Sequence, residues 1–327
     1  MYEKIVIYVC LYVDDMLIIS NEMKGILETK RFLSSTFKMK DLGQVDTILV
    51  IKVKQNSGTY ELCQSHYVEK VLDMFKHLKF KELNTSFDLS VKFERNSGRA
   101  VAQLKYANAT GYLMYLMLCT RPGIVFTVSK LSRFTRNPSI EHWKAIGKVF
   151  GYLMKTKDLG LHYSSFPTIL EGSNDASWIS SVEDNKSTTD LVFTLAGGAI
   201  SWKSKKQMCI THSTMESEFV ALASVQQAAE WLRDFLKEIH LASKTVSKVS
   251  INCDSLTTLA RAYNEMHNEK SRHISLRHEY VRKLIKNGII SLTFMRSSYN
   301  LADPCRKPLT RYLVKKSSRG LGLKLIE

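Results

Sequence analysis

Six acidic residues occupy positions from which their carboxylates could hold metal ions. Asp14 and Asp15 are adjacent, and they interrupt an apolar run that is rich in β-branched residues. Four further acids are spread over the second half of the chain, namely Asp175, Glu218, Asp254 and Asp303. Carboxylates that converge from several elements can hold two divalent ions about 3.5 to 4 Å apart, an arrangement that supports phosphoryl-transfer chemistry.

The Asp14-Asp15 pair lies between two short apolar stretches, and this pattern predicts a tight hairpin with both carboxylates at its tip. An Asp-Asp dipeptide between strands is more often only a turn. The run is not expected to span a membrane, because each central aspartate would cost roughly 2.5 to 3.5 kcal/mol there. No basic region with a small-residue cleavage site precedes the run, so we expect no secretory signal peptide.

Asp175 and Asp254 are each associated with a predicted strand. Asp175 lies inside the strand expected over Ile169–Ile179, where an acid is costly unless it is paired or bound to metal. Asp254 follows the strand expected over Val246–Cys253, and sites in sheets of this kind collect at the carboxyl ends of strands. Asp254 could instead act as the N-cap of the next helix, and that alternative is strong.

Glu218 and Asp303 stand near the beginnings of predicted helices. Ser213 and Glu216 fit a capping box, so Glu216 already has a structural role and Glu218 is the better candidate for a metal ligand. Asp303 also has an alternative role in capping, with Asn300 as the N-cap. Taken singly, each acid is better explained by structure, whereas the four together indicate a ring of carboxylates around two metal ions.

The composition predicts a folded, basic protein. Its 327 residues are 44% hydrophobic and carry a formal net charge of +16. This excess of Lys and Arg favours a polyanionic partner, most simply nucleic acid, and the absence of a strongly basic amphipathic anchor argues against a membrane. The six cysteines form no C-x-x-C pair, which indicates neither a zinc knuckle nor a disulfide scaffold. We expect a reduced, intracellular protein, cytoplasmic or nuclear and not secreted.

Hydrophobic periodicity predicts a mixed first part and then a helical bundle. Within residues 1–80 we expect a helix over Lys24–Phe37, strands over Val45–Lys54 and Thr59–Cys63, and a helix over His66–Phe75. Residues 81–105 are polar and less regular. Three helices follow, over Tyr112–Leu118, Ile124–Phe134 and Ile140–Met154.

The second half of the chain changes to a sheet pattern. Three strands are expected over Ile169–Ile179, Thr189–Ala196 and Ala199–Lys203, and a long helix follows from Thr214 to about His240. Beyond it we expect, in order, strand Val246–Cys253, helices Ser255–Tyr263 and Ile274–Lys286, strand Ile289–Met295 and a last helix from Asp303. The order β-β-β-α-β-α-α-β-α predicts a mixed sheet, antiparallel first and parallel later.

A series of short motifs in a fixed order resembles one known family. The earlier motifs are Leu11-Tyr-Val-Asp-Asp-Met16, Phe37-Lys-Met-Lys-Asp-Leu-Gly43, Gly111-Tyr-Leu-Met-Tyr-Leu116, Thr120-Arg-Pro122, Leu131-Ser-Arg-Phe134 and His142-Trp143. The later ones are Asp175-Ala-Ser-Trp178, Lys186-Ser-Thr188, Gly197-Gly-Ala-Ile-Ser-Trp-Lys-Ser-Lys-Lys-Gln207, Ser213-Thr-Met-Glu-Ser-Glu218 and Leu301-Ala-Asp303. Over nearly its whole length the chain resembles the C-terminal part of a copia-type retrotransposon Pol polyprotein, from the end of reverse transcriptase through ribonuclease H.

The resemblance implies roles for the acids. Asp14 and Asp15 match two of the three metal-binding aspartates of the polymerase palm. The ribonuclease H carboxylates, which bind two Mg²⁺ ions (with Mn²⁺ as an alternative) and hydrolyse RNA paired to DNA, are matched by Asp175, Glu218, Asp254 and Asp303. Such a hybrid is gripped through its backbone shape and 2′-hydroxyls. Candidate phosphate contacts are the basic tail after Pro304 and the group Trp202, Lys203, Lys205 and Lys206.

The chain also departs from the family pattern. In the family, the first palm aspartate and the fingers lie well upstream of the Asp-Asp hairpin, whereas here the pair is at residues 14 and 15. We therefore expect no DNA synthesis by this chain alone. RNA-directed DNA polymerase activity would belong to a longer polyprotein, with an upstream reverse-transcriptase segment as partner. Pro304 follows Asp303 directly and is expected to push it away from helical geometry.

These expectations define an α/β protein with three domains. They are a remnant of the reverse-transcriptase palm over 1–80, a helical thumb over 81–165, and a ribonuclease H-like mixed five-stranded sheet with flanking helices over 166–327. The expected function is metal-dependent cleavage of RNA in RNA–DNA hybrids. One alternative is a non-catalytic nucleic-acid-binding remnant of a decayed retrotransposon, and another is an unstable relic whose partial palm exposes apolar edges.

Overall fold

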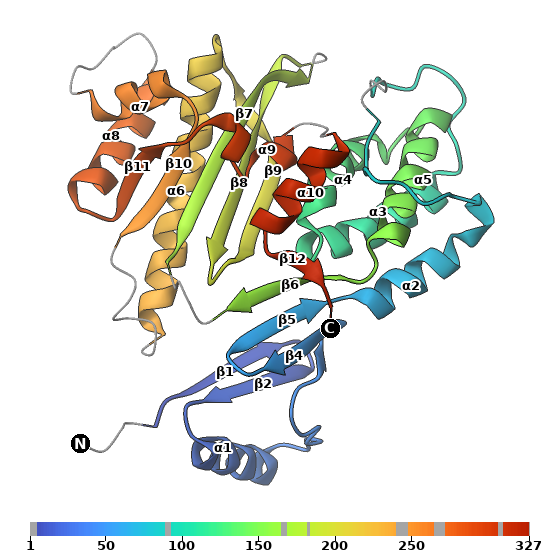
Figure 1. Cartoon of the computed structure of the whole chain (residues 1–327), viewed down its shortest axis with the longest axis vertical. Coiled ribbons are helices and arrows are strands. Elements are labelled where there is room, and N and C mark those ends of the chain that lie inside the picture. Colours follow the sequence, from blue (N-terminus) through green and yellow to red (C-terminus); the bar gives the residue numbers. More distant parts are fainter. Residues whose placement is uncertain are drawn as a thin grey trace. The chain divides into compact units, whose positions relative to one another are not determined.

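The computed structural model of the chain describes residues 5–88, 93–164, 169–181, 184–239, 248–264, 272–306 and 310–326 (Figure 1). The chain forms two compact units, Met1–Lys54 and Gln55–Glu327. Within the described ranges, no helix is both long enough and apolar enough to cross a membrane.

The first unit begins with a β-hairpin. Its elements are β1 (Ile7–Tyr12), β2 (Asp15–Ser20), α1 (Met23–Thr36), β3 (Thr47–Ile48) and β4 (Ile51–Asn56). Strands β1 and β2 are antiparallel, with Tyr12 opposite Asp15. Helix α1 approaches the hairpin closely at Gly25, where an added Cβ would lie 2.9 Å from the Ser20 hydroxyl oxygen. The predicted hairpin and the helix after it are both confirmed.

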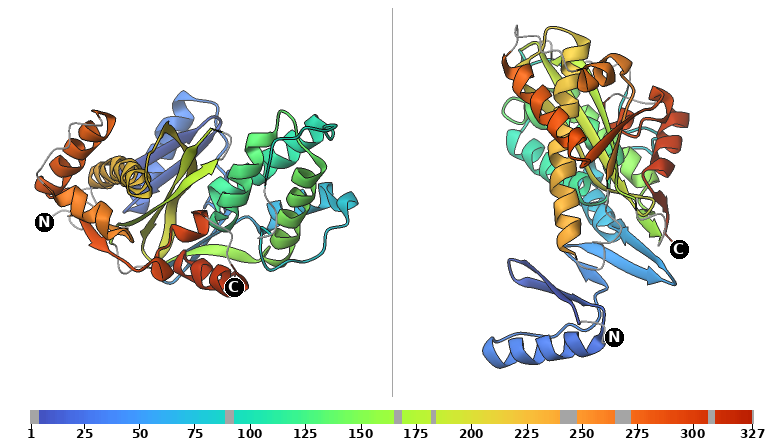
Figure 2. Two further views of the ribbon diagram at one scale, coloured as in Figure 1. Left: turned by 90° about the horizontal axis from the view of Figure 1, so that it is seen from above. Right: turned by 90° about the vertical axis from the view of Figure 1, so that its left-hand side faces the viewer.

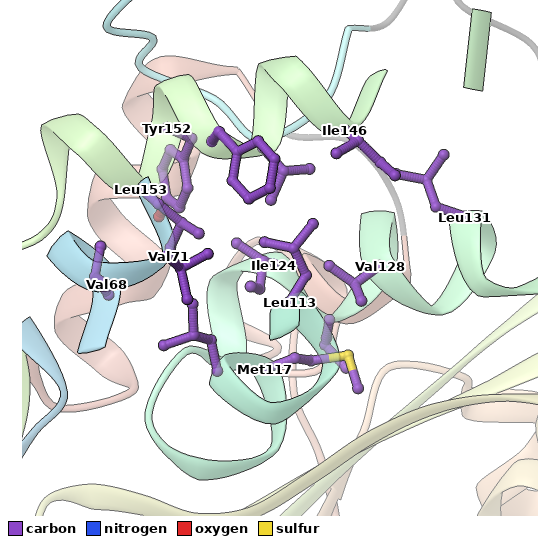
Figure 3. Packing of buried hydrophobic residues seen from close by; sticks show 14 of the residues in the cluster. Val68, Val71, Leu113, Met117, Ile124, Val128, Leu131, Ile146, Tyr152 and Leu153 are labelled. Carbon is purple, nitrogen blue, oxygen red and sulfur yellow. The ribbon is translucent and has the colours of Figure 1, made fainter. Parts of the chain in front are cut away.

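The second unit begins with a strand and a helical segment. The elements are β5 (Thr59–Cys63), α2 (Ser65–Met74), η1 (Lys76–Leu78), α3 (Gln103–Cys119), η2 (Pro122–Ile124), α4 (Val125–Leu131), η3 (Ser132–Phe134) and α5 (Ile140–Lys155). The four α-helices bury one apolar cluster, to which Val71, Leu113, Val128 and Leu153 each contribute from a different helix (Figure 3). The predicted three-helix bundle is therefore confirmed, with α2 packed against it as a fourth helix.

Gly151 lets the segment before the bundle pass closely over α5. Its backbone oxygen accepts a hydrogen bond from Leu83 N at 3.1 Å, and an added Cβ would lie only 2.2 Å from Lys81 O. We expect Gly151→Ala to lower the free energy of unfolding by about 2 kcal/mol, because overpacking forces backbone shifts.

Gly147→Ala on the same helix is the matched control, since nothing lies within 4 Å of its Cβ position. It should stabilise the protein by about 0.5 to 1 kcal/mol, because alanine is the better helix former. Chemical denaturation of both variants measures the difference, and equal midpoints would contradict the predicted close approach.

A five-stranded mixed sheet follows in the second unit. Its strands are β7 (Glu171–Ser181), β8 (Lys186–Leu195), β9 (Gly198–Ile210), β10 (Val249–Cys253) and β11 (Ile290–Phe294). The strands lie in the order β11-β10-β7-β8-β9. Strand β8 is antiparallel to its neighbours β7 and β9, while β10 is parallel to both β7 and β11. This arrangement confirms the predicted α/β class and mixed sheet. The predicted start of the fourth strand at Val246 lies outside the described residues.

Helices cover both faces of this sheet. The helices that follow β9 are α6 (Thr214–Glu238), α7 (Leu256–Tyr263) and α8 (Arg272–Lys286). Leu191 and Phe193 of β8 belong to the core shared with α6, whereas Val192 between them belongs to the core of the helical segment. Figure 2 shows α6 against one face and helices α3 to α5 on the opposite side. The sheet and the helical segment therefore share a core.

The basic residues after Pro304 lie largely in folded elements. The predicted last helix is confirmed as the short α9 (Asp303–Arg306), which follows η4 (Ser297–Tyr299). The sequence did not predict α10 (Arg311–Gly320) or β12 (Leu323–Leu325), and β12 pairs with β6 (Leu159–Ser164). Leu321 and Leu323 are buried in the core of the helical segment. Gly322 between them has a φ of 77°, and an added Cβ would lie 2.7 Å from Gly198. The end of the chain is thus packed against the sheet.

Candidate metal centre

Three acids that are far apart in the sequence come together in the structure. An oxygen atom from each of Asp175, Glu218 and Asp254 lies within 4.8 Å of the others. Asp175 is fully buried, Glu218 is 5% exposed and Asp254 is partly exposed. Among the described residues, no other group of three or more potential ligands converges in this way. Three carboxylate oxygens are a donor set that suits Mg²⁺ or Mn²⁺, so these residues fit a hard divalent cation.

The parallel pairing of β7 and β10 places Asp175 beside Asp254. Asn252 lies opposite Ser173 in this pairing. Two residues later, Asp175 lies within β7 and Asp254 directly follows the end of β10. Asp175 Oδ1 also accepts a hydrogen bond from Ala176 N at 2.8 Å, which fixes the carboxylate in the strand. The register of two neighbouring strands therefore determines this part of the site.

Glu218 joins Asp175 and Asp254 from the first turns of α6. The nearby Glu216 takes part in capping that helix. Ser213 Oγ accepts a hydrogen bond from Glu216 N at 3.1 Å, and Glu216 Oε2 accepts one from His212 N at 2.7 Å. The structure thus confirms Ser213 as the N-cap, and it occupies the Glu216 side chain with the N–H of the residue before the cap. Glu218 lies two residues after Glu216 and converges with Asp175 and Asp254.

Capping of α7 does not involve Asp254. The N-cap of this helix is Ser255, whose hydroxyl oxygen accepts a hydrogen bond from Thr258 N at 3.3 Å. The alternative interpretation of Asp254 as the N-cap is therefore wrong, because the hydroxyl one residue later already receives the helix N–H group.

Asp303 begins α9, which packs against β7 and β8. The expectation that Pro304 pushes Asp303 out of helical geometry is wrong, since proline is tolerated in the first turn, where its missing N–H needs no partner. The described structure does not include Asp303 among the three acids whose oxygens converge. Asp303 and Asp175 both act on the Cys305 thiol, where their charges add to the effect of burial in raising its pKa.

Asn300 ties the start of α9 to the strand that carries Asp175. Its Oδ1 accepts a hydrogen bond from Ala302 N at 3.0 Å, and its Nδ2 donates to Asn174 O at 2.9 Å. Asn300 is 5% exposed, so both bonds are shielded from water. The sequence analysis identified Asn300 only as a cap, because its second partner is distant in the sequence.

We expect Asn300→Ala to destabilise the protein by about 1 to 3 kcal/mol, because it leaves a buried carbonyl without its donor. The same change should also slow any reaction that needs Asp303. Asn300→Asp is the matched variant: it keeps an acceptor for Ala302 but cannot donate to Asn174. Unfolding curves of the two variants show which bond contributes more to stability. A loss in Asn300→Ala alone points to the bond with Ala302, and an equal loss in both variants points to the bond with Asn174. Wild-type stability in both variants would show that neither bond matters.

Two buried thiols border the acidic group but are poor metal ligands. Burial raises the pKa of Cys253 to about 12, and the charges of Glu218 and Asp254 add to this effect. Burial also raises the pKa of Cys305 well above its usual value, with Asp190, Asp175 and Asp303 contributing. Because the thiolate is the form that binds metal, these shifts leave the carboxylates as the ligands at neutral pH.

Asp14 and Asp15 lie in the other unit and are both exposed. Asp15 is the first residue of β2, and Asp14 lies in the turn at the hairpin tip. Val13 beside them has a φ of 51°, a conformation that a β-branched residue rarely adopts. Neither aspartate belongs to a group of three or more potential ligands within the described part of the chain.

The candidate nucleic-acid contacts on β9 fall into two groups. Lys203 and Lys205 are exposed on this edge strand. Lys206 donates to Asp184 Oδ2 at 2.6 Å, and this bond lowers the pKa of Asp184 to about 2. The indole N–H of Trp202 donates to Met117 O at 2.8 Å, and its ring packs on the core of the helical segment. The two exposed lysines are therefore the members most available to a ligand.

The sequence analysis missed Asp190, which lies directly opposite Asp175 on β8. Both residues are fully buried. A signal was available, because Asp190 is an acid within a predicted strand and the argument applied to Asp175 applies equally to it. Only the pairing register, which joins distant parts of the chain, reveals that the two acids face each other.

Sequence comparisons connect this site to a known group of proteins. Residues 1–86 match the family described as "Reverse transcriptase (RNA-dependent DNA polymerase)". The chain is 34% identical to the Retrovirus-related Pol polyprotein from transposon TNT 1-94 of Nicotiana tabacum, over 93% of this chain and 23% of that protein. It is 32% identical to the Putative transposon Ty5-1 protein of Saccharomyces cerevisiae, over 65% of this chain and 71% of that protein. The chain belongs to the copia-type Pol polyproteins.

As a copia-type Pol chain, it spans less than a quarter of the length of the TNT 1-94 polyprotein. The segment that matches the reverse-transcriptase family includes Asp14 and Asp15, whereas the three converging acids lie beyond it. Among solved structures, the Pol chain is similar to a foamy viral protease-reverse transcriptase in complex with RNA/DNA hybrid. That likeness has a TM-score of 0.48 and 14% sequence identity, and it covers 92% of this chain and 37% of the other.

Proposed function

We propose that this copia-type Pol chain cleaves the RNA strand of RNA–DNA hybrids in a reaction that depends on divalent metal. The supporting observation is the convergence of Asp175, Glu218 and Asp254 beside the carboxyl end of β10 in a mixed five-stranded sheet. Family membership supports the same chemistry, because Asp175 and Glu218 lie in the motifs quoted above and the resemblance also matches Asp254 to a ribonuclease H carboxylate. The proposal also assigns Asp303, at the start of α9, as a fourth acid of the site.

In this proposal, Asp175, Glu218 and Asp254 hold the metal ions. Two bound Mg²⁺ ions, or Mn²⁺ in their place, supply an activated water and stabilise the leaving oxygen. The chain itself supplies placement, since every ligand is attached to a fixed part of a strand or a capped helix. Asp175 is held by its bond to Ala176 N, and the Ser213 cap fixes the turn that precedes Glu218.

Binding of the hybrid is assigned to the basic surface. Lys203 and Lys205 are exposed on β9, and the chain carries a net charge of +16. Lysines of this kind neutralise phosphates without reading the base sequence, so affinity should fall as salt rises. Discrimination for a hybrid would rest on its shape and on the 2′-hydroxyls of the RNA strand.

A comparison of four labelled substrates tests the proposed specificity. The same RNA sequence is offered with Mg²⁺ as a hybrid with DNA, as a duplex with RNA and as a single strand, alongside double-stranded DNA. We expect cleavage of the RNA only when it is paired with DNA. Equal cleavage of the single strand would contradict the proposal, and binding of all four without cleavage would support a non-catalytic nucleic-acid-binding role instead.

A further inference from the structure

Asp190 lies beside one acid of the site, and no ribonuclease H motif in the sequence assigns it a role. In the antiparallel pairing of β7 and β8, Asp175 and Asp190 are direct cross-strand partners, so their side chains project from the same face of the sheet. Both are fully buried, which leaves little water to screen one charge from the other. Like charges in this arrangement are destabilising, so the pair calls for a compensating cation.

Basic residues of the helical segment lie close to Asp190. Arg133 in η3 and Lys130 in α4 both interact with its charge, and burial lowers the pKa of each of these cations while Asp190 raises it. Lys130 is also held in place over the Phe126 ring, with its Nζ 4.8 Å from the ring centroid. Helix α4 packs against α9 and β9, which keeps these cations on the Asp190 side of the sheet.

We propose that Asp190 is a positioning residue that strengthens divalent-metal binding by the Asp175 group, and that Arg133 and Lys130 offset its charge when no metal is bound. The inference rests on the proposed function, because it takes the Asp175 group to be a metal site. A second buried carboxylate makes the potential at Asp175 more negative, and this favours a divalent cation. The helical segment thereby contributes to the metal centre of the sheet.

The test is thermal denaturation of the full chain with and without MnCl₂, together with a Mn²⁺ titration at neutral pH. We expect Asp190→Asn to raise the melting temperature of the metal-free protein, because it removes one of two opposed carboxylates. The same variant should bind Mn²⁺ about tenfold more weakly, and its melting temperature should rise less when metal is added. Asp190→Ser serves as a second variant that also removes the charge.

Asp184→Asn is the matched control, since Asp184 also interacts with Arg133 but pairs with Lys206 at 2.6 Å. It should leave Mn²⁺ affinity unchanged. Arg133→Gln should tighten Mn²⁺ binding in the wild-type background and have no effect beside Asp190→Asn, which a double-mutant cycle measures.

Three results would count against these ideas. Unchanged Mn²⁺ affinity in both Asp190 variants would overturn the inference alone. A lower metal-free melting temperature with an unchanged response to Mn²⁺ would show that Asp190 has only a structural role. No stabilisation of the wild-type chain by Mn²⁺ or Mg²⁺ would contradict the proposed function as well.

Discussion

Asp175→Asn is expected to slow cleavage of RNA in a hybrid by about a thousandfold. Bound metal supplies several kcal/mol of transition-state stabilisation, and each ~1.4 kcal/mol corresponds to a factor of ten in rate. Asparagine has nearly the same shape but lacks the charge that holds a divalent cation. Its amide can still occupy the buried position in β7, so the fold and the binding of hybrid in EDTA should both persist.

Glu171→Gln is the control for this prediction, because Glu171 lies on the same strand but is exposed and outside the group of converging acids. It should leave the cleavage rate unchanged. Cleavage rates and hybrid affinities of the two variants separate loss of chemistry from loss of binding. A fully active Asp175→Asn variant would contradict the assignment of this acid to the metal centre.

Removal of the helical segment is the second change with a large expected effect. We expect residues 166–327 alone to show no cooperative thermal transition, whereas the unit Gln55–Glu327 should unfold cooperatively. The face of the sheet that carries Val192, Ala199 and Trp202 is covered by the helical segment. Each large apolar side chain that loses such burial costs about 1.5 to 3 kcal/mol, and a whole domain is stable by only about 5 to 15 kcal/mol.

Hydrogen bonds across the same boundary strengthen this expectation. Trp202 Nε1 donates to Met117 O at 2.8 Å, and Tyr163 Oη donates to Ala199 O at 2.7 Å. Strand β12 would also lose its partner β6. Calorimetry of the two truncated chains gives the comparison. Equal melting temperatures would show that the sheet folds independently, in agreement with the three-domain division predicted from the sequence.

Local patterns in the sequence were sufficient to predict the order of strands and helices in the sheet region and part of the candidate site. The alternation of strands and helices after residue 169 follows from short-range periodicity, and the N-cap at Ser213 is a local signal that the structure confirms. The position of Asp254 follows the rule that sites in such sheets collect at the carboxyl ends of strands. Each of these features can be predicted from residues that are close together in the sequence.

The features that were missed depend on partners that are distant in the sequence. Asp190 lies opposite Asp175 only because of the β7–β8 register. Asn300 donates a hydrogen bond to Asn174 O across a separation of 126 residues in the sequence. Trp202 was interpreted as part of a nucleic-acid surface, but its indole is bonded to Met117 O. Strand β12 is too short to give a periodic signal, and its pairing with β6 fixes it in place.

The most direct test of the metal-dependent nuclease is a time course of RNA cleavage in a hybrid by the full chain as Mg²⁺ is titrated. The proposed site predicts cleavage that increases with Mg²⁺ until the site is saturated, stops when EDTA is added and returns when Mn²⁺ is supplied. Intact RNA at every concentration of both ions, in a chain that is folded and binds the hybrid, would contradict it.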